Sequence, residues 1–523
     1  MIQFILALIF TSAITIPSNA AEETYFCQDS LAKIPIRQDG RTKPLYVHAK
    51  EAIKYLTNKT SHGELSAVQT FCLLSLEGMG LKNNINLMAR VDHVDVKEML
   101  DLNEKENQVS FTTILEEAPA LRREMRKEMG PKGIQTAKSK AIAKLINQAG
   151  LYKNIVEGQN WLLPAVTRDR VDWIPVTAFL REEKIIAARE KSDKPFQYVI
   201  NEEVKKFEDM KGDLHKLEYN YSRANLPVVS LILTLLALAS LTLFKKFTVA
   251  LGFSLATILI QLSLISIRVF ISGRAPITNM YETVMFSGFG ALVLSMAVGH
   301  FKKEKVFLYV GLMYNACTLM MMNFATGMLS ESISPLVPVL RDNFWLSTHV
   351  TTIIMSYGAL ALSWILANTV LIKKKFTGLN KQDDLYYSEL IYTTLKYGTI
   401  MLGAGIILGG VWADYSWGRF WGWDPKETWS LIAFIIYMAI LHGRNTTWIS
   451  PKRFIPLVAG AFMSIMMAWF GVNYILASGL HSYGFSEGGA IFLGSFFLIQ
   501  TGVIIISTID MNLPWSSSSE KNH

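Results

Sequence analysis

The chain has 523 residues, of which 50% are hydrophobic and only 18% are charged, and its mean hydropathy is +0.26. These values exclude a purely soluble protein and indicate a membrane protein with a polar domain. The formal net charge of +8 does not indicate nucleic-acid binding, because the lysines and arginines cluster beside apolar segments, where positive charge sets membrane topology.

Residues 1–20 are predicted to be a signal peptide. The apolar stretch at 2–16 is short for a membrane span, and the small residues after it favour cleavage after Ala20. A positively charged start is missing, so an uncleaved anchor is the alternative. In either case the segment that follows should be exported.

Residues 21–225 are polar and form a predicted extracytoplasmic domain of mixed, helix-rich structure. Helical patterning is found at 49–55, 138–149 and 177–221. Export would allow a disulfide between Cys27 and Cys72. The histidines of this domain lack metal-ligand spacing, so surface positions or local hydrogen bonds are expected for them. They are His48, His62, His93 and His215.

From residue 226 onward the chain repeats apolar segments of the length that a bilayer requires. We therefore predict a polytopic α-helical membrane protein with about nine transmembrane helices. It comprises a first span within 226–248, an eight-helix unit at 249–508 and a cytoplasmic tail at 509–523. The predicted spans are 226–244, 249–271, 282–299, 306–326, 345–372, 394–412, 428–443, 454–476 and 488–508.

The loops between these spans alternate in charge. By the positive-inside rule the lysine-rich loops are cytoplasmic, so the polar domain, the loop before the seventh span and the loop after the eighth face outward. The basic side carries Lys245, Lys246, Lys302, Lys303, Lys305, Lys373–Lys375, Arg444, Lys452 and Arg453.

The segment 413–429 is unusually rich in tryptophan, and Gly418, Gly422 and Pro425 break any long helix in it. If its first half is helical, Trp417, Trp421 and Asp424 share one face. Such an aromatic shelf suits a large, flat, apolar ligand, whereas an interfacial aromatic belt is the alternative. The aromatic residues are Trp417, Trp421, Trp423 and Trp429, and the charged residues that could hold the polar edge of the ligand are Arg419, Asp424, Lys426 and Glu427.

Two histidines are predicted at the depth of this segment, His349 at the outer start of the fifth span and His481 beyond the eighth. Two imidazoles could bind one iron above and below a porphyrin, although a single histidine at a span end is often only interfacial. His442 differs, because it lies thirteen residues after Trp429, about 20 Å further in along a helix. His300, at an inner span end, is expected to be interfacial.

These residues resemble the cytochrome c biogenesis proteins CcsA/ResC, which carry a tryptophan-rich WWD signature. The resemblance covers most of residues 249–508. The similar stretches are 417–427, Thr348-His349-Val350 with Ser356-Tyr357, Gly479 to Phe485, Leu441-His442-Gly443-Arg444, and Pro276 to Glu282.

The resemblance implies that heme b is moved across the bacterial inner membrane and presented, reduced, at the outer face. It would then be attached covalently to the CxxCH thiols of apocytochrome c, which a thioredoxin-like reductant could keep reduced. His349 and His481 would be iron ligands of an outer site and His442 of an inner one. By charge and location alone, Arg341, Arg419 and Lys426 are candidates for the propionates.

The family's second transmembrane histidine comes from a CcsB/ResB component. Here residues 21–225 and the first span resemble only the end portion of that component, and the stretch 40–45 is similar to one in fused versions. No histidine of this chain clearly partners His442. We therefore predict a separate CcsB/ResB-like subunit. The alternatives are a heme handler of the CcmC/CcmF type and a b-type electron-transfer subunit that oxidises quinol.

Overall fold

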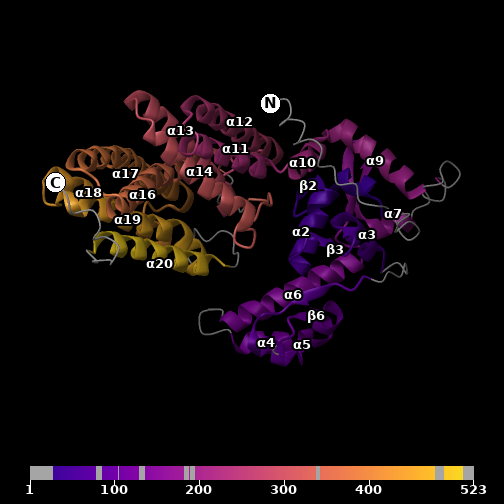
Figure 1. Cartoon of the computed structure of the whole chain (residues 1–523). Coiled ribbons are helices and arrows are strands. Elements are labelled where there is room, and N and C mark those ends of the chain that lie inside the picture. The colour runs from indigo at the N-terminus through magenta and orange to yellow at the C-terminus, as the bar shows by residue number, and fades with distance from the viewer. Residues whose placement is uncertain are drawn as a thin grey trace. The chain divides into compact units, whose positions relative to one another are not determined.

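The structure is a computed structural model (Figure 1). It divides into two compact units, Met1–Arg223 and Ala224–His523, which are described separately. The predicted signal peptide and His481 lie outside the described residues, and so does the predicted tail except for Ile509. The described residues are 27–77, 85–103, 105–128, 136–181, 188, 195–336, 342–476 and 488–509.

The N-terminal unit is mixed and helix-rich, as predicted. Its described strands form four antiparallel two-stranded sheets. The strands are β1 (Pro35–Gln38), β2 (Arg41–Pro44), β3 (Ser61–His62), β4 (Leu65–Ser66), β5 (Met88–Arg90), β6 (Gln108–Ser110), β7 (Leu162–Thr167) and β8 (Arg170–Pro175). The helices are η1 (Asp29–Lys33), α2 (Leu45–Thr57), α3 (Ala67–Glu77), α4 (Val94–Met99), α5 (Phe111–Lys127), α6 (Ala137–Val156), α7 (Val176–Arg181), α9 (Pro195–Lys211) and α10 (Leu214–Arg223).

Two of the predicted helical segments lie within α2 and α6, but the expected helix at 177–221 is divided. Between α9 and α10, Gly212 has φ of +81°, a left-handed conformation that ends the helix. Helical periodicity continued across this break, which is why the sequence pattern alone suggested one helix.

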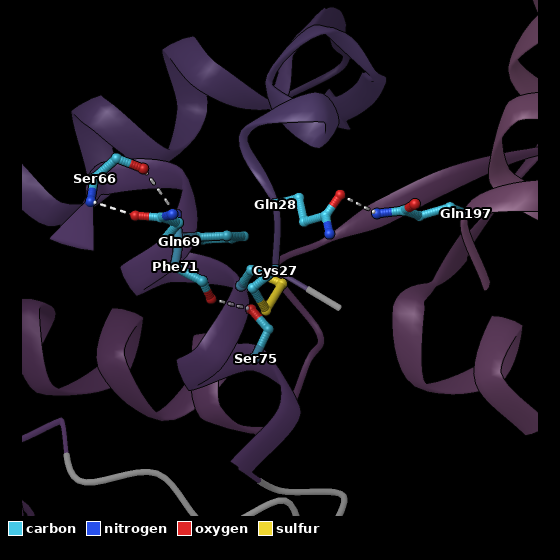
Figure 2. The surroundings of a disulfide bond; sticks show 8 residues. Cys27, Gln28, Ser66, Gln69, Phe71, Ser75 and Gln197 are labelled. Carbon is cyan, nitrogen blue, oxygen red and sulfur yellow. Dashed lines mark hydrogen bonds between the residues drawn. A yellow bond between two sulfur atoms is a disulfide. The ribbon is translucent and has the colours of Figure 1, made fainter. Parts of the chain in front are cut away.

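A disulfide joins Cys27 to Cys72 on α3, which confirms the predicted pairing (Figure 2). At the start of α3, the Ser66 hydroxyl accepts from the Gln69 amide and the Gln69 side chain accepts from the Ser66 amide, a reciprocal cap. Both sulfurs belong to the buried core of the unit. The bond therefore ties the chain at Cys27 to a well-capped core helix.

In the membrane unit each of the nine predicted spans is helical. Among the described residues, seven helices are long and apolar enough to cross a membrane. The helices are α11 (Leu226–Thr242), α12 (Phe247–Ser272), α13 (Met280–Lys302), α14 (Val306–Phe324), α15 (Asn343–Trp345), the π-helix η3 (Leu346–Val350), α16 (Thr351–Phe376), α17 (Lys381–Trp417), α18 (Pro425–Asn445), α19 (Pro451–Met466), the π-helix η4 (Met467–Leu476) and α20 (Gly489–Thr508).

The predicted first and seventh spans, α11 and α18, are not among the seven. Helix α11 has 17 residues. Helix α18 carries charged groups near both ends, and its uncharged stretch before His442 covers only 428–441, about 21 Å of helix. An apolar stretch of that length is short for a 30 Å hydrocarbon core.

The membrane helices form two groups (Figure 1): α11–α14, and α16–α20. The groups meet where α13 and α14 pack against α16. Small residues allow α13 and α14 to approach closely, since a Cβ added at Gly311 would lie 1.8 Å from Ser295 Oγ.

Candidate functional site

The tryptophan-rich segment is a loop between two helices. Helix α17 continues to Trp417 and ends at Gly418, whose φ of +66° is the left-handed conformation typical of a helix end. Helix α18 starts at Pro425, with Asp424 as its N-cap. We predicted that Trp417, Trp421 and Asp424 share one face if this segment is helical. That prediction is wrong, because Gly418 terminates the helix before Trp421.

The charged residues of this loop mostly hold the loop itself. The Asp424 carboxylate accepts a hydrogen bond from the Lys426 amide at 2.9 Å, while Glu427 accepts from the amides of Gly422 and Asp424 at 2.7 and 3.2 Å. Arg419 forms an ion pair with Glu427 at 3.2 Å. A capping box of this kind fixes where α18 begins, so Asp424 has a structural role.

Beside the loop lies a pocket that is open to solvent, and its empty space, with the solvent at its mouth included, is about 1070 Å³. Its walls come from the start of α13, from η3 and α16, from α17, from the tryptophan loop, from α18 and from η4. Most of the lining is apolar or aromatic and the rest is polar, as is typical of small-molecule sites. The lining residues used below are His349, Trp412, Phe420, Trp421, Lys426 and Trp469.

His349 is placed by a π-helical turn and by the glycines of α17. Its Nδ1 lies 2.9 Å from the carbonyl oxygen of Gly405, which can only accept a hydrogen bond. Nδ1 therefore carries the proton, and the lone pair of the neutral ring is on Nε2. The ring packs on Gly409, where an added Cβ would lie 2.5 Å from Cε1, and its centroid is 5.7 Å from that of Trp412.

Of the other predicted site residues, Trp421 and Lys426 line the pocket. Trp417, Gly418, Arg419, Gly422 and Trp423 do not belong to its described lining. Trp423 is 70% exposed, and its ring meets that of Trp421 edge-on at 6.0 Å. The loop thus contributes Trp421 to the described lining of the pocket, and Trp417 and Trp423 do not join it there.

Sequence reasoning missed the aromatic residues that complete the walls. Trp412 and Trp469 are 6% and 4% exposed, and both lie in helices that read only as apolar spans. Phe420 packs on Gly410, where an added Cβ would lie 2.5 Å from its ring. The stretch Gly-Ala-Gly-Ile-Ile-Leu-Gly-Gly at 403–410 was the available signal, because so many glycines in one helix indicate close approach of side chains.

Among the described residues of the lining, Lys426 is the one with a cationic side chain. Lys426 lies at the start of α18 and its Nζ is 3.5 Å from the side-chain oxygen of Asn473. Arg419, by contrast, is neutralised by Glu427 and stacks over Trp417 at 5.6 Å. Arg341 lies outside the described residues.

His442 is at the far end of α18 from the pocket. It is exposed on the surface of the unit, on the same helical face as the exposed Ile435, and its Nδ1 lies 2.9 Å from the Met438 carbonyl oxygen. Nearby, Arg444 donates to the Ser388 carbonyl oxygen and hydroxyl, each at 2.7 Å, and fixes the end of the helix. The structure therefore separates His442 from the pocket.

Residues 277–481 match the family described as Cytochrome C assembly protein. A cytochrome c biogenesis protein CcsA from Guillardia theta is 32% identical over 296 residues, which are 51% of this chain and 96% of the relative. Relatives of the same name from Prochlorococcus marinus (strain NATL1A) and Chlamydomonas reinhardtii are 34% and 36% identical, each over 41% of this chain, and over 78% and 62% of their own lengths.

Fold and similarity together define a polytopic helical membrane protein of the cytochrome c assembly class. The chain belongs to the CcsA family of cytochrome c biogenesis proteins. Its role is therefore in cytochrome c biogenesis, and its several apolar helices make it a multi-pass membrane protein.

Proposed function

We propose that this chain binds heme b in the pocket beside His349 and presents it for covalent attachment to apocytochrome c. The observation that carries the proposal is an imidazole with its lone pair on Nε2, set among aromatic walls. Backbone carbonyls commonly fix the tautomer of metal-binding histidines in this way. The pocket would face the outer side of a bacterial inner membrane, in line with the positive-inside rule.

The polar groups divide the work of holding the ligand. His349 would supply one axial ligand and His481 the other, which would protect the iron until transfer. Lys426, rather than the paired Arg419, would meet a heme propionate, because it is the cation of the described pocket lining. Trp412, Phe420, Trp421 and Trp469 would contact the porphyrin and its vinyl-bearing edge.

The proposed attachment of heme to apocytochrome c does not require a general acid or base from this chain. A cysteine of the apocytochrome CxxCH motif adds its S–H across a heme vinyl group, so that sulfur bonds to one vinyl carbon and hydrogen to the other. This addition consumes no oxidant. The site needs to supply proximity and orientation, and the apocytochrome histidine then replaces one axial ligand.

His442 would bind heme at an earlier, inner stage together with a second subunit. An ionisable side chain exposed among apolar residues of a membrane helix is costly unless something covers it. A CcsB/ResB-like subunit that brings its own histidine would cover it and complete the iron coordination. Copurification of this chain alone with a full inner heme would contradict this assignment.

The test is the absorption spectrum of the detergent-purified protein and of its His349→Ala and His481→Ala variants. His300→Ala is the matched control, because His300 lies in the last turn of α13 and does not belong to the described pocket lining. We expect a low-spin b-type spectrum that both outer substitutions abolish and the control retains. A spectrum indifferent to both substitutions would contradict the outer heme site and favour a transport or partner-assembly role. Heme reduction driven by quinol, without cytochrome c maturation, would favour an electron-transfer role.

A further inference from the structure

A buried ion pair lies in the membrane unit next to the pocket wall. Arg268 on α12 and Glu282 on α13 are joined by contacts of 2.7 Å from Nη2 and 3.2 Å from Nε to the same carboxylate oxygen. Both side chains are 1% exposed. An ion pair so deeply buried gives little net stability, since apolar residues of similar size often do as well. We therefore looked for another role of this ion pair in the contacts that the two side chains make.

The second oxygen of Glu282 holds the turn that precedes α13. It accepts from the Thr278 amide and from the Thr278 hydroxyl, both at 2.8 Å. In the same turn, the Asn279 side chain accepts from the Glu282 amide at 2.9 Å and caps the helix. The Glu282 carboxylate thus holds Thr278 in place, and Asn279 caps the first turn of α13.

Arg268 and two polar side chains near it also donate hydrogen bonds to the backbone carbonyl groups of the segment 331–334. Arg268 donates to the Glu331 carbonyl oxygen at 3.1 Å, and Asn279 donates to that of Ser332 at 3.2 Å. Arg274 donates to the Ser334 carbonyl oxygen at 2.6 Å. These hydrogen bonds therefore hold the segment 331–334 against the turn before α13.

The turn before α13 and the first turn of that helix form one wall of the pocket, to which residues 277–280 and Thr283 contribute. This wall contacts the part of the lining that η4 contributes, because the Trp469 indole donates to the Thr283 hydroxyl at 3.2 Å. The Asn473 amide lies 3.0 Å from the Met280 sulfur, and Asn473 is also the contact of Lys426. The wall that Glu282 fixes therefore touches both an aromatic residue and the cation contact of the pocket.

We propose that Arg268 and Glu282 are positioning residues that set the distance of the 277–283 wall from His349, and so the fit of a flat ligand. The inference deepens the proposed function and rests on it for the identity of the ligand. Neither side chain belongs to the described lining, so they act through Thr278, whose amide and hydroxyl donate to the Glu282 carboxylate, and through the helical turn that continues to Thr283.

The test is the double variant Arg268→Met/Glu282→Met in the full-length chain. Removal of both charges leaves no uncompensated buried charge, so the variant should fold. The variant loses the hydrogen bonds from Thr278 to Glu282 and from Arg268 to the Glu331 carbonyl group. The matched control is Gln261→Leu/Asn315→Leu, which removes a buried polar pair at 3.1 Å that also involves α12 but lies outside the pocket lining.

Two readouts are needed, hydrogen exchange of the 277–283 amides without ligand and titration with hemin. We expect the ion-pair variant to exchange about tenfold faster in this segment and to bind hemin about tenfold more weakly, with a shifted Soret band. The control should change neither. Wild-type exchange and hemin binding in the folded ion-pair variant would overturn the proposal, as would equal effects in the control.

The exchange measurement separates this inference from the proposed function. If the wild type binds no hemin, the proposed function is wrong. The amide exchange rates of residues 277–283 still decide whether the ion pair positions this wall of the pocket. If the double variant does not fold, Arg268→Lys retains the charge and removes the guanidinium contacts. It should change exchange and hemin binding in the same directions, and an unchanged Arg268→Lys protein would overturn the proposal.

Discussion

His349 Nδ1 lies 2.9 Å from the carbonyl oxygen of Gly405, on a helix that also brings Gly409 against the imidazole ring. The hydrogen bond to Gly405 fixes the tautomer of the imidazole. Gly409 has no side chain and so leaves room for the ring. The orientation of the proposed iron ligand therefore depends on two glycines of α17.

Replacement of Gly409 by alanine should displace the imidazole. The added Cβ would lie 2.5 Å from Cε1, and α17 and α16 are too closely packed for the backbone to yield freely. Overpacking of this kind costs about 1–3 kcal/mol, so we expect hemin affinity to fall about tenfold or more and the low-spin spectrum to weaken.

The control for this substitution is Gly494→Ala on α20, where no atom lies within 4 Å of the added Cβ. That variant should bind hemin as the wild type does, because alanine is a better helix former than glycine. Normal ligation in Gly409→Ala, measured by absorption and electron paramagnetic resonance, would show that His349 does not need this contact.

Substitution of Lys426 by methionine should weaken binding of heme but not of its dimethyl ester. Lys426 lines the pocket, and a hydrogen bond to a charged group contributes about 1.5–3 kcal/mol. Heme esterified at both propionates lacks that charge, so the two titrations isolate the contact. Equal loss with both ligands would mean that Lys426 acts through pocket shape instead.

Arg419→Met is the comparison, since this arginine is 30% exposed and paired with Glu427. A partly exposed ion pair contributes about 0.2–1 kcal/mol, so the change should lower the stability of the loop slightly and leave hemin affinity nearly unchanged. A loss of affinity larger than that of Lys426→Met would reverse the two assignments.

The membrane helices were predictable, whereas the pocket lining was predictable only in part. About 20 apolar residues in a row identify a span, and all nine segments are helical, although only seven of the described helices are long and apolar enough to cross a membrane. Within a uniformly apolar helix, however, periodicity does not distinguish a face toward a pocket from one toward lipid. That is why His349, Trp421 and Lys426 were found from their chemistry and Trp412 and Trp469 were not.

The tryptophan loop shows a second limit. The spacing of Trp417, Trp421 and Asp424 suits a helix, but the left-handed Gly418 and the Asp424 cap decide the local structure. A short-range backbone preference here overrides side-chain periodicity. The sequence contained both signals, and their relative weight became evident only from the structure.

Loss of the Cys27–Cys72 disulfide should destabilise the N-terminal domain. The bond closes a loop with a sequence separation of 45 residues, for which the chain-entropy relation gives about 4 kcal/mol. We expect Cys27→Ser/Cys72→Ser in the full-length chain to accelerate amide exchange in α2 and α3. Exchange in the membrane helices α16 and α17 serves as the internal control, and unchanged α3 protection would contradict the expected role.

The stability of the N-terminal domain should fall in mild acid because of His48. Burial, with the positive charge of Lys43 adding to it, lowers the pKa of this histidine from 6.5 to about 3, although its Nε2–H donates to the Asn160 carbonyl oxygen at 3.2 Å. Between these pH values the unfolded chain binds the proton and the folded one does not. Stability is therefore fully present above about pH 6.5 and is lost as the pH falls toward 3, by about 3 kcal/mol between pH 7 and pH 4.

The matched variant is His48→Gln, which can still donate to Asn160 but has no titrating group. Amide exchange of α2, corrected for the intrinsic effect of pH, should show a loss of protection at pH 4 in the wild type and a flatter profile in the variant. The comparison isolates His48 because other titrating groups, including His215 beside Glu208, are common to both proteins. Identical pH profiles would mean that His48 does not control acid unfolding, despite its burial in the core.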